Sequence, residues 1–242
     1  MSTSDRKIPS ALASTTTMAG LTWKRLLRGR ALWVSCLIAA LPVLYAAARR
    51  RFGGDSDPSE MGAELFTFQV LILALLAPMF VGASIAEEIE ERTTTYLWSR
   101  PLPRWSVLAG KLLALVPVTA AIVLASWMAS AWLSWSALPP TRTILAIGGG
   151  ALAMSMVATG IATLAPKHGM ALTIVYMLFF DFPIGVLPAT FQELSIGHHV
   201  RVLSGLRTPF DAGTPLSATI GLIVVGGLWG LIGALRVRRL EA

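Results

Sequence analysis

The chain has 242 residues, of which 55% are hydrophobic and only 14% are charged. A soluble domain of this length could not bury so much apolar surface, and the mean hydropathy of +0.67 places most of the chain in lipid. The net charge of +7 comes from Lys and Arg dispersed at the ends of apolar runs, which excludes a nucleic-acid-binding face. The single cysteine, Cys36, excludes an intramolecular disulfide and a cysteine-based metal site.

The first 30 residues divide into two segments. Residues 1–17 are rich in Ser and Thr and lack apolar periodicity, so we expect a flexible cytoplasmic tail. From 18 to 30, apolar side chains recur at helical spacing and basic side chains fall elsewhere on the helix, which predicts an amphipathic elbow helix in the membrane surface. A solvated basic linker is the alternative. The residues expected to define the elbow are Trp23, Lys24, Arg25 and Arg28.

Six apolar segments are long enough to span a membrane, since a spanning helix needs about 20 residues to cross about 30 Å of hydrocarbon. The predicted fold is therefore an all-α integral membrane protein. The predicted spans are about 31–48, 65–86, 107–133, 143–165, 169–190 and 214–235. The fifth is interrupted by Asp181, Pro183 and Pro188.

The distribution of Lys and Arg predicts the orientation. Placing the N-terminus inside puts 14 of these residues in the cytoplasm and leaves 6 outside, although the triple arginine 49–51 opposes this bias locally. We therefore expect a multi-pass protein of the plasma (bacterial inner) membrane with both termini cytoplasmic.

The connector between the second and third spans carries five charges in six residues, from Glu87 to Arg92. Immersing them at about 2.5–3.5 kcal/mol each would cost more than about 12 kcal/mol, so the connector must face water. As a helix it would present an apolar stripe beside an acidic face, which suits a partner surface. Pro101 and Pro103 would end that helix, and Trp105 with Lys111 would hold the next span at the membrane interface. The alternative is a solvated loop whose acids add solubility.

The same connector carries a family resemblance. The run from Glu88 through Ser99-Arg100-Pro101-Leu102-Pro103-Arg104 to Gly110-Lys111 resembles the signature of the type-2 ABC transporter permeases. In that family an acidic segment is followed by Gly-Thr, a leucine, a Ser-Arg-Pro or Ser-Pro turn, an arginine, and Gly-Lys at the start of the third span. Six spans, a basic N-terminal elbow and a longer outer connection before the last span also match. Arg92 departs from the pattern, because the family usually has glycine before Thr93.

The resemblance implies a transmembrane permease domain over 18–242, part of an ABC exporter. Such a chain forms a homodimer or heterodimer of permeases among membrane lipids, and each copy binds one ABC-type ATPase subunit. The connector then acts as a coupling helix between spans 2 and 3. The residues expected to couple to the ATPase are Glu87, Glu88, Glu90, Glu91, Arg92, Thr93, Tyr96, Leu97, Ser99, Arg100, Pro101 and Arg104.

The residues also indicate that ATP hydrolysis takes place on another subunit. The sequence contains no G-x-x-x-x-G-K-[ST] phosphate loop, so we expect no catalytic residue and no bound cofactor in this chain. ATP and Mg are expected on the partner ATPase. A membrane-embedded enzyme is disfavoured, since neither H-E-x-x-H nor G-x-S-x-G occurs.

Asp181 is the one acid inside a predicted span, which makes it a candidate for a translocation path. Pro183 could instead end the span there and leave Asp181 close to water. A buried Asp181 would favour the runner-up function, an ion-coupled transporter or channel without an ATPase, provided that the two halves formed an inverted repeat. No such repeat is evident.

The remaining polar and small residues predict packing more than chemistry. His198 and His199 are adjacent and would point to different faces of a helix, so with Glu193 they predict no metal site. Short helices on the outer membrane surface are expected over 191–211. Small residues at helix-contact spacing are candidates for packing between spans or protomers. They are Ser126, Ser130 and Ser134, and Gly226 with Gly230.

Overall fold

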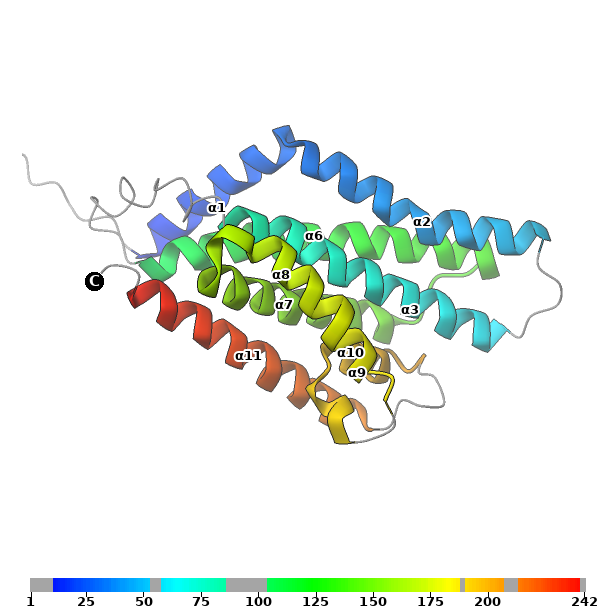
Figure 1. Ribbon diagram of the computed structural model, residues 1–242. Helices are drawn as coiled ribbons and strands as arrows, with labels where there is room; N and C mark the ends of the chain where they lie inside the picture. Colours follow the sequence, from blue (N-terminus) through cyan, green and yellow to red (C-terminus); the bar gives the residue numbers. More distant parts are fainter. Residues whose placement is uncertain (1–10, 53–57, 86–103, 188–189, 207–212, 240–242) are drawn as a thin grey trace, which may run out of the picture.

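The computed structural model describes residues 11–52, 58–85, 104–187, 190–206 and 213–239, and within these ranges every regular element is helical (Figure 1). The long helices lie side by side along one direction. The elements are α1 (Ala11–Arg28), α2 (Arg30–Phe52), α3 (Pro58–Ala77), the π-helix η1 (Pro78–Gly82), α6 (Arg104–Trp135), α7 (Thr141–Leu164), the 3-10 helix η2 (Pro166–His168), α8 (Gly169–Tyr176), the π-helix η3 (Met177–Asp181), α9 (Phe182–Ile184), the 3-10 helix η4 (Thr190–Leu194), α10 (Ile196–Ser204) and α11 (Pro215–Arg239).

Five helices in the described part of the chain are long and apolar enough to cross a membrane, which confirms an all-α membrane protein. They correspond to the first four and the last of the predicted spans. Their bounds are Arg30–Phe52, Glu60–Ile85, Trp105–Trp135, Thr141–Leu164 and Pro215–Val237.

The helical segment in the structure is shorter than the predicted fifth span, 169–190. The chain there forms α8, η3 and α9 in succession and leaves the helix after Ile184, so the segment is shorter than the about 20 residues of an upright span. Pro183 lies in its last turn, where a proline cannot continue the hydrogen-bond ladder. The segment still runs back along the bundle, so that α11 starts at the opposite end from α8 and returns (Figure 1).

The first helix begins at Ala11, so the predicted flexible tail is wrong for residues 11–17. The threonine hydroxyls in this stretch bond within the helix. The hydroxyls of Thr15 and Thr17 donate to the carbonyls of Ala11 and Ala13, at 2.9 Å and 2.7 Å. Ser14 and Met18 are buried, and α1 packs along α6. Tertiary packing therefore makes helical a segment whose composition is typical of disorder.

The bundle is built around α7, which contacts α3, α6, α8, α10 and α11. The most apolar windows of the second and fourth spans are 72% and 67% buried, whereas those of α2 and α11 are only 22% buried. The outer faces of α2 and α11 are therefore the ones that lipid or another protein would cover.

Small residues set the close contact between α7 and α11. A Cβ on Gly160 would lie 2.8 Å from the carbonyl oxygen of Trp229, and one on Gly226 would lie 3.0 Å from the Cα of Ala153. A Cβ on Gly230 would lie 2.8 Å from the sulfur of Met156. The predicted packing role of Gly226 and Gly230 is thus confirmed within the chain.

The two ends of the bundle differ in content. The start of α1, the start of α6 and the end of α11 lie together at one end, called here the connector end (Figure 1). The far end holds α9 and α10. Contrary to the predicted surface helices, nearly all residues of α10 are buried, and α10 packs against α3, α7 and α11. Gly150 of α7 permits this, since a Cβ there would lie 2.6 Å from Val200.

Candidate functional site

The predicted coupling residues Glu87 to Pro101 lie outside the described residues, and Arg104 is the first residue of α6. The structure describes the two helices that this connector joins. The second span continues through η1 to Ile85, which is buried, and α6 starts 19 residues later in the sequence. The arrangement of these two helices therefore defines the frame that holds the connector.

Lys111 ties the two helices together. It lies in the second turn of α6 with 1% of its surface exposed, and its ammonium Nζ donates a hydrogen bond to the backbone carbonyl of Ser84. The prediction that Lys111 anchors the span at the membrane interface is wrong, because the side chain turns inward. A buried charge needs polar partners, and the carbonyl near the end of the second span provides one. Trp105, which is 53% exposed, remains free to occupy the interface.

Gly110, the neighbour of Lys111, brings α1 against α6. A Cβ at Gly110 would lie 2.7 Å from the carbonyl oxygen of Thr15 and 2.8 Å from the Cβ of Met18. Any larger residue would push the two helices apart, because one of these neighbours is backbone. The Gly-Lys pair therefore joins three elements: Gly110 contacts α1, and Lys111 binds the second span.

The predicted elbow residues lie on one exposed surface of α1. Trp23, Lys24, Arg25 and Arg28 are all exposed, whereas Met18 and Leu26 are buried. The helix breaks at Gly29 and the chain continues as α2, with a sharp bend between them (Figure 1). Basic and aromatic side chains thus surround the bend at the point where a span begins.

At the far end, Asp181 is 3% exposed and its carboxylate accepts hydrogen bonds from the start of α10. Oδ1 accepts the N–H of Ile196 at 2.7 Å, and Oδ2 accepts the N–H of Gly197 at 3.0 Å and the hydroxyl of Ser195 at 3.3 Å. A carboxylate at a helix N-terminus satisfies amides that the helix cannot, and the helix dipole favours its charge. Asp181 therefore fixes the start of α10.

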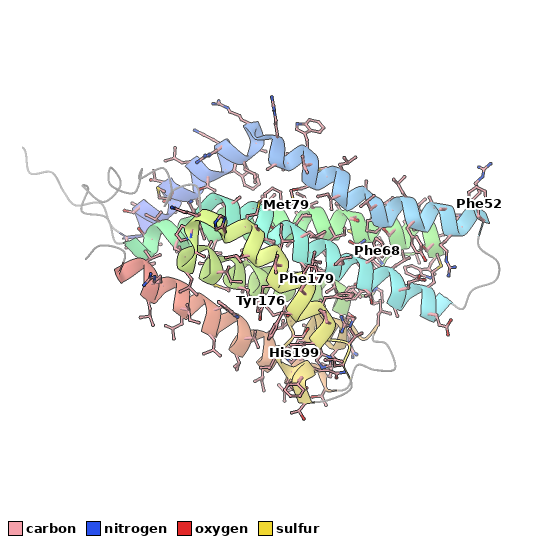
Figure 2. All side chains as sticks on the ribbon, in the orientation of Figure 1. Phe52, Phe68, Met79, Tyr176, Phe179 and His199 are labelled. Atoms are coloured by element: carbon pink, nitrogen blue, oxygen red, sulfur yellow. The ribbon has the colours of Figure 1, made fainter. Side chains whose placement is uncertain are left out.

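Two further polar residues complete this far-end cluster. The guanidinium of Arg201 attracts Asp181 and donates from Nη2 to the carbonyl of Gly185 at 2.6 Å. His199 donates from Nε2 to the carbonyl of Glu193 at 2.9 Å, and burial lowers the pKa of His199 below its ordinary value (Figure 2). Among the described residues, no group of three His, Cys, Asp or Glu could hold a metal ion.

The profile of the ABC-2 family transporter proteins matches residues 16–204, from within α1 to the last residue of α10. The chain belongs to the ABC-2 transporter family. No individual curated protein matches it. The family match confirms the predicted resemblance to type-2 ABC transporter permeases and identifies a multi-pass membrane protein that is the permease component of an ABC transporter.

The interior of this ABC-2 chain also holds a polar cluster that the sequence analysis missed. Gln69 of α3 is fully buried and donates from Nε2 to the hydroxyls of Ser126 and Ser130 at 3.1 Å and 3.5 Å. Ser126 in turn donates to the carbonyl of Ala39 in α2 at 2.5 Å. The predicted packing role is therefore confirmed for Ser126 and Ser130.

Of the residues that the sequence did not single out, Gln69 could have been recognised in advance. Gln69 is an amide within the apolar run 65–77, and a strongly polar side chain inside a span is by default paired or functional. The partner of Lys111 had no such signal, since the acceptor is the backbone of Ser84 and a backbone carbonyl exists at every position.

Proposed function

We propose that this ABC-2 chain is the permease subunit of an ABC exporter, forms the substrate path across the plasma membrane, and is driven by ATP hydrolysis on a separate ATPase subunit. ATP and Mg bind to that ATPase. Two permeases, identical or related, form the functional pair, and each binds one ATPase through the connector.

The observation that carries this proposal is the contact of Gly110 and Lys111 with α1 and Ser84. Together these contacts fasten the end of the second span, the start of the third and α1 into one unit. A push on the connector from a partner would therefore be transmitted to three helices at once. The coupling role proposed for Glu87, Glu91 and their neighbours rests on these contacts and on the family. Membership of the family favours an ATP-driven permease over an ion-coupled transporter or channel.

The course of the chain supports six passes with both termini in the cytoplasm. The start of α1 and the end of α11 lie at the same end of the bundle, which agrees with an even number of passes (Figure 1). In this arrangement α8, η3 and α9 form the fifth pass, and α1 is the elbow on the cytoplasmic surface. Arg236 lies near the end of α11, and Lys167 lies in η2 between the end of α7 and the start of α8, in agreement with the excess of basic residues predicted on the cytoplasmic side.

The translocation-path role of Asp181 stays a prediction. Its burial is what such a role requires, but its carboxylate oxygens are already bound by α10. The geometry favours a positioning role at the far end of the path, in which Asp181 holds α10 between α7 and α11.

The experiment that tests the function is reversal of charge on the connector. The permease with Glu87, Glu88 and Glu91 each replaced by Lys is purified from its native membrane at the same level as the wild type. We expect the wild-type chain to co-purify with an ATPase carrying a phosphate loop, and the triple variant to lose association or to uncouple ATP hydrolysis from transport.

The matched control places three reversals at the opposite end of the second span: Asp55→Lys, Asp57→Lys and Glu60→Lys. It should retain the ATPase, because these acids are predicted to face the outside. Unchanged association and ATP hydrolysis in the connector variant would show that its acids only add solubility. Absence of any ATPase from the wild-type preparation would overturn the proposed function itself.

A further inference from the structure

A cleft of about 270 Å³ lies between the bend from α1 to α2 and the π-helix η1. We call it the bend cleft. Figure 2 shows Met79 of η1 beneath this bend. The apolar part of the cleft is lined by Leu26, Ala31, Met79, Phe80 and Leu115. Its polar part is lined by Thr22, Arg25, Arg30 and Ser84. The bend cleft thus combines an apolar wall with a cationic rim.

Among the described residues, the charged side chains that line the bend cleft are all basic. Arg25 and Arg30 both line it, and no described Asp or Glu does. The ammonium of Lys111 is bound to the carbonyl of Ser84 and adds a third, buried positive charge next to this lining residue. Charges near low-dielectric walls act more strongly than they would in bulk water, so this cleft favours an anion.

The residues around the bend cleft are of the types found at the level of the lipid headgroups. Arg30 begins the first span, and Trp23 and Trp33 are exposed on either side of the bend. Exposed Trp and flanking Arg are typical of the boundary between hydrocarbon and water. Drug-sized ligands occupy pockets of about 300–1,000 Å³. The bend cleft, at about 270 Å³, is smaller than this range, so it suits a phosphate-containing headgroup and not a whole lipid molecule.

We propose that the bend cleft binds an anionic phospholipid. The phosphate of the headgroup binds Arg25 and Arg30, and the acyl chain lies along Met79 and Leu115. Anionic headgroups bind basic pockets between membrane helices by this chemistry. Because the lining comes from α1, α2, η1 and α6, one bound lipid would contact the elbow, the first span and both helices that hold the connector.

The test is a competition between two lipids on the purified full chain with its associated subunits. The protein is stripped of lipid, incubated with equal amounts of phosphatidylglycerol and phosphatidylethanolamine, and analysed by native mass spectrometry. We expect wild type to retain phosphatidylglycerol preferentially. Each Lys or Arg near an anionic headgroup strengthens binding by about fivefold, so Arg30→Gln should lose about fivefold and Arg25→Gln/Arg30→Gln about twenty-fivefold.

The matched control is Lys24→Gln/Arg28→Gln, which removes the same charge from exposed positions of α1 that do not line the cleft. It should retain phosphatidylglycerol within about twofold of wild type. An equal loss in this control would show general surface attraction and overturn the site, as would the absence of any preference in wild type. Displacement of the lipid by millimolar glycerol phosphate would also overturn the proposal, since the site would then be one for small anions.

Discussion

Asp181 holds the start of α10, and replacing it with alanine should loosen the far end of the bundle. The substitution leaves the buried N–H groups of Ile196 and Gly197 without the acceptor they now share. Each unsatisfied buried donor costs about 1–3 kcal/mol, so Asp181→Ala should lower the free energy of unfolding by about 2–6 kcal/mol. For a chain of this length that corresponds to a thermal midpoint at least about 4 °C lower. Asp181→Asn keeps one acceptor oxygen and should have a smaller effect.

The assay is thermal unfolding in detergent, followed by the monodisperse fraction that survives heating. The matched control is Glu193→Ala, which removes an acid near α10 whose side chain is 54% exposed and 3.9 Å from the Nε2 of His199. Because the Glu193 carboxylate is exposed to water, its loss should cost no more than about 1 kcal/mol, and this variant should resemble wild type. If Asp181→Ala unfolds within about 1 °C of wild type and of the control, the carboxylate does not anchor α10 and the reasoning fails.

Two other substitutions test contacts at opposite ends of the bundle. Gly221→Ala would place a Cβ 2.1 Å from the Nε2 of His199 and should lower the thermal midpoint through about 1–3 kcal/mol of overpacking. The matched control is Gly227→Ala, which has no neighbouring heavy atom within 4 Å and should leave the thermal midpoint unchanged or raise it. If the Gly221→Ala and Gly227→Ala variants have the same thermal midpoint, α10 is not packed against α11 as the structure shows. At the connector end, Lys111→Met should reduce co-purification with the ATPase relative to Lys167→Met, which alters an exposed lysine of η2. Equal retention would show that the bond to Ser84 has no part in coupling.

The spans were predictable because a long apolar run is a strong signal. The run from Leu65 to Ile85 stays helical throughout, including its π-helical turn at η1. The segment around Asp181 is different, since Pro183 and the following Gly185 end the helix before a full span is complete. Hydropathy averages over such local breaks and therefore assigns the segment a length that its backbone does not have.

Partners far apart in sequence explain the other differences. α10 has His and Arg in a short sequence, which predicts a surface helix, but Gly185 and Asp181 satisfy its Arg201 and its first amides from another element. Lys111 turns inward for the same reason, because Ser84 supplies an acceptor 27 residues earlier in the chain. The family motif located the pair Gly110-Lys111, but only packing shows that each residue contacts a different helix.

The π-helix η1 has a geometric consequence for the connector end. A π-helical turn contains one residue more than the α-helical ladder would place there, and one residue turns an α-helix by about 100°. Everything after Gly82, including Ser84 and Ile85, is therefore rotated by about a quarter turn from where an uninterrupted helix would direct it. Winding this turn back into regular α-helix would swing the Ser84 carbonyl away from Lys111 while leaving the first part of α3 in place. The π-helical turn η1 thus determines the direction in which the last turn of the second span faces where the connector begins.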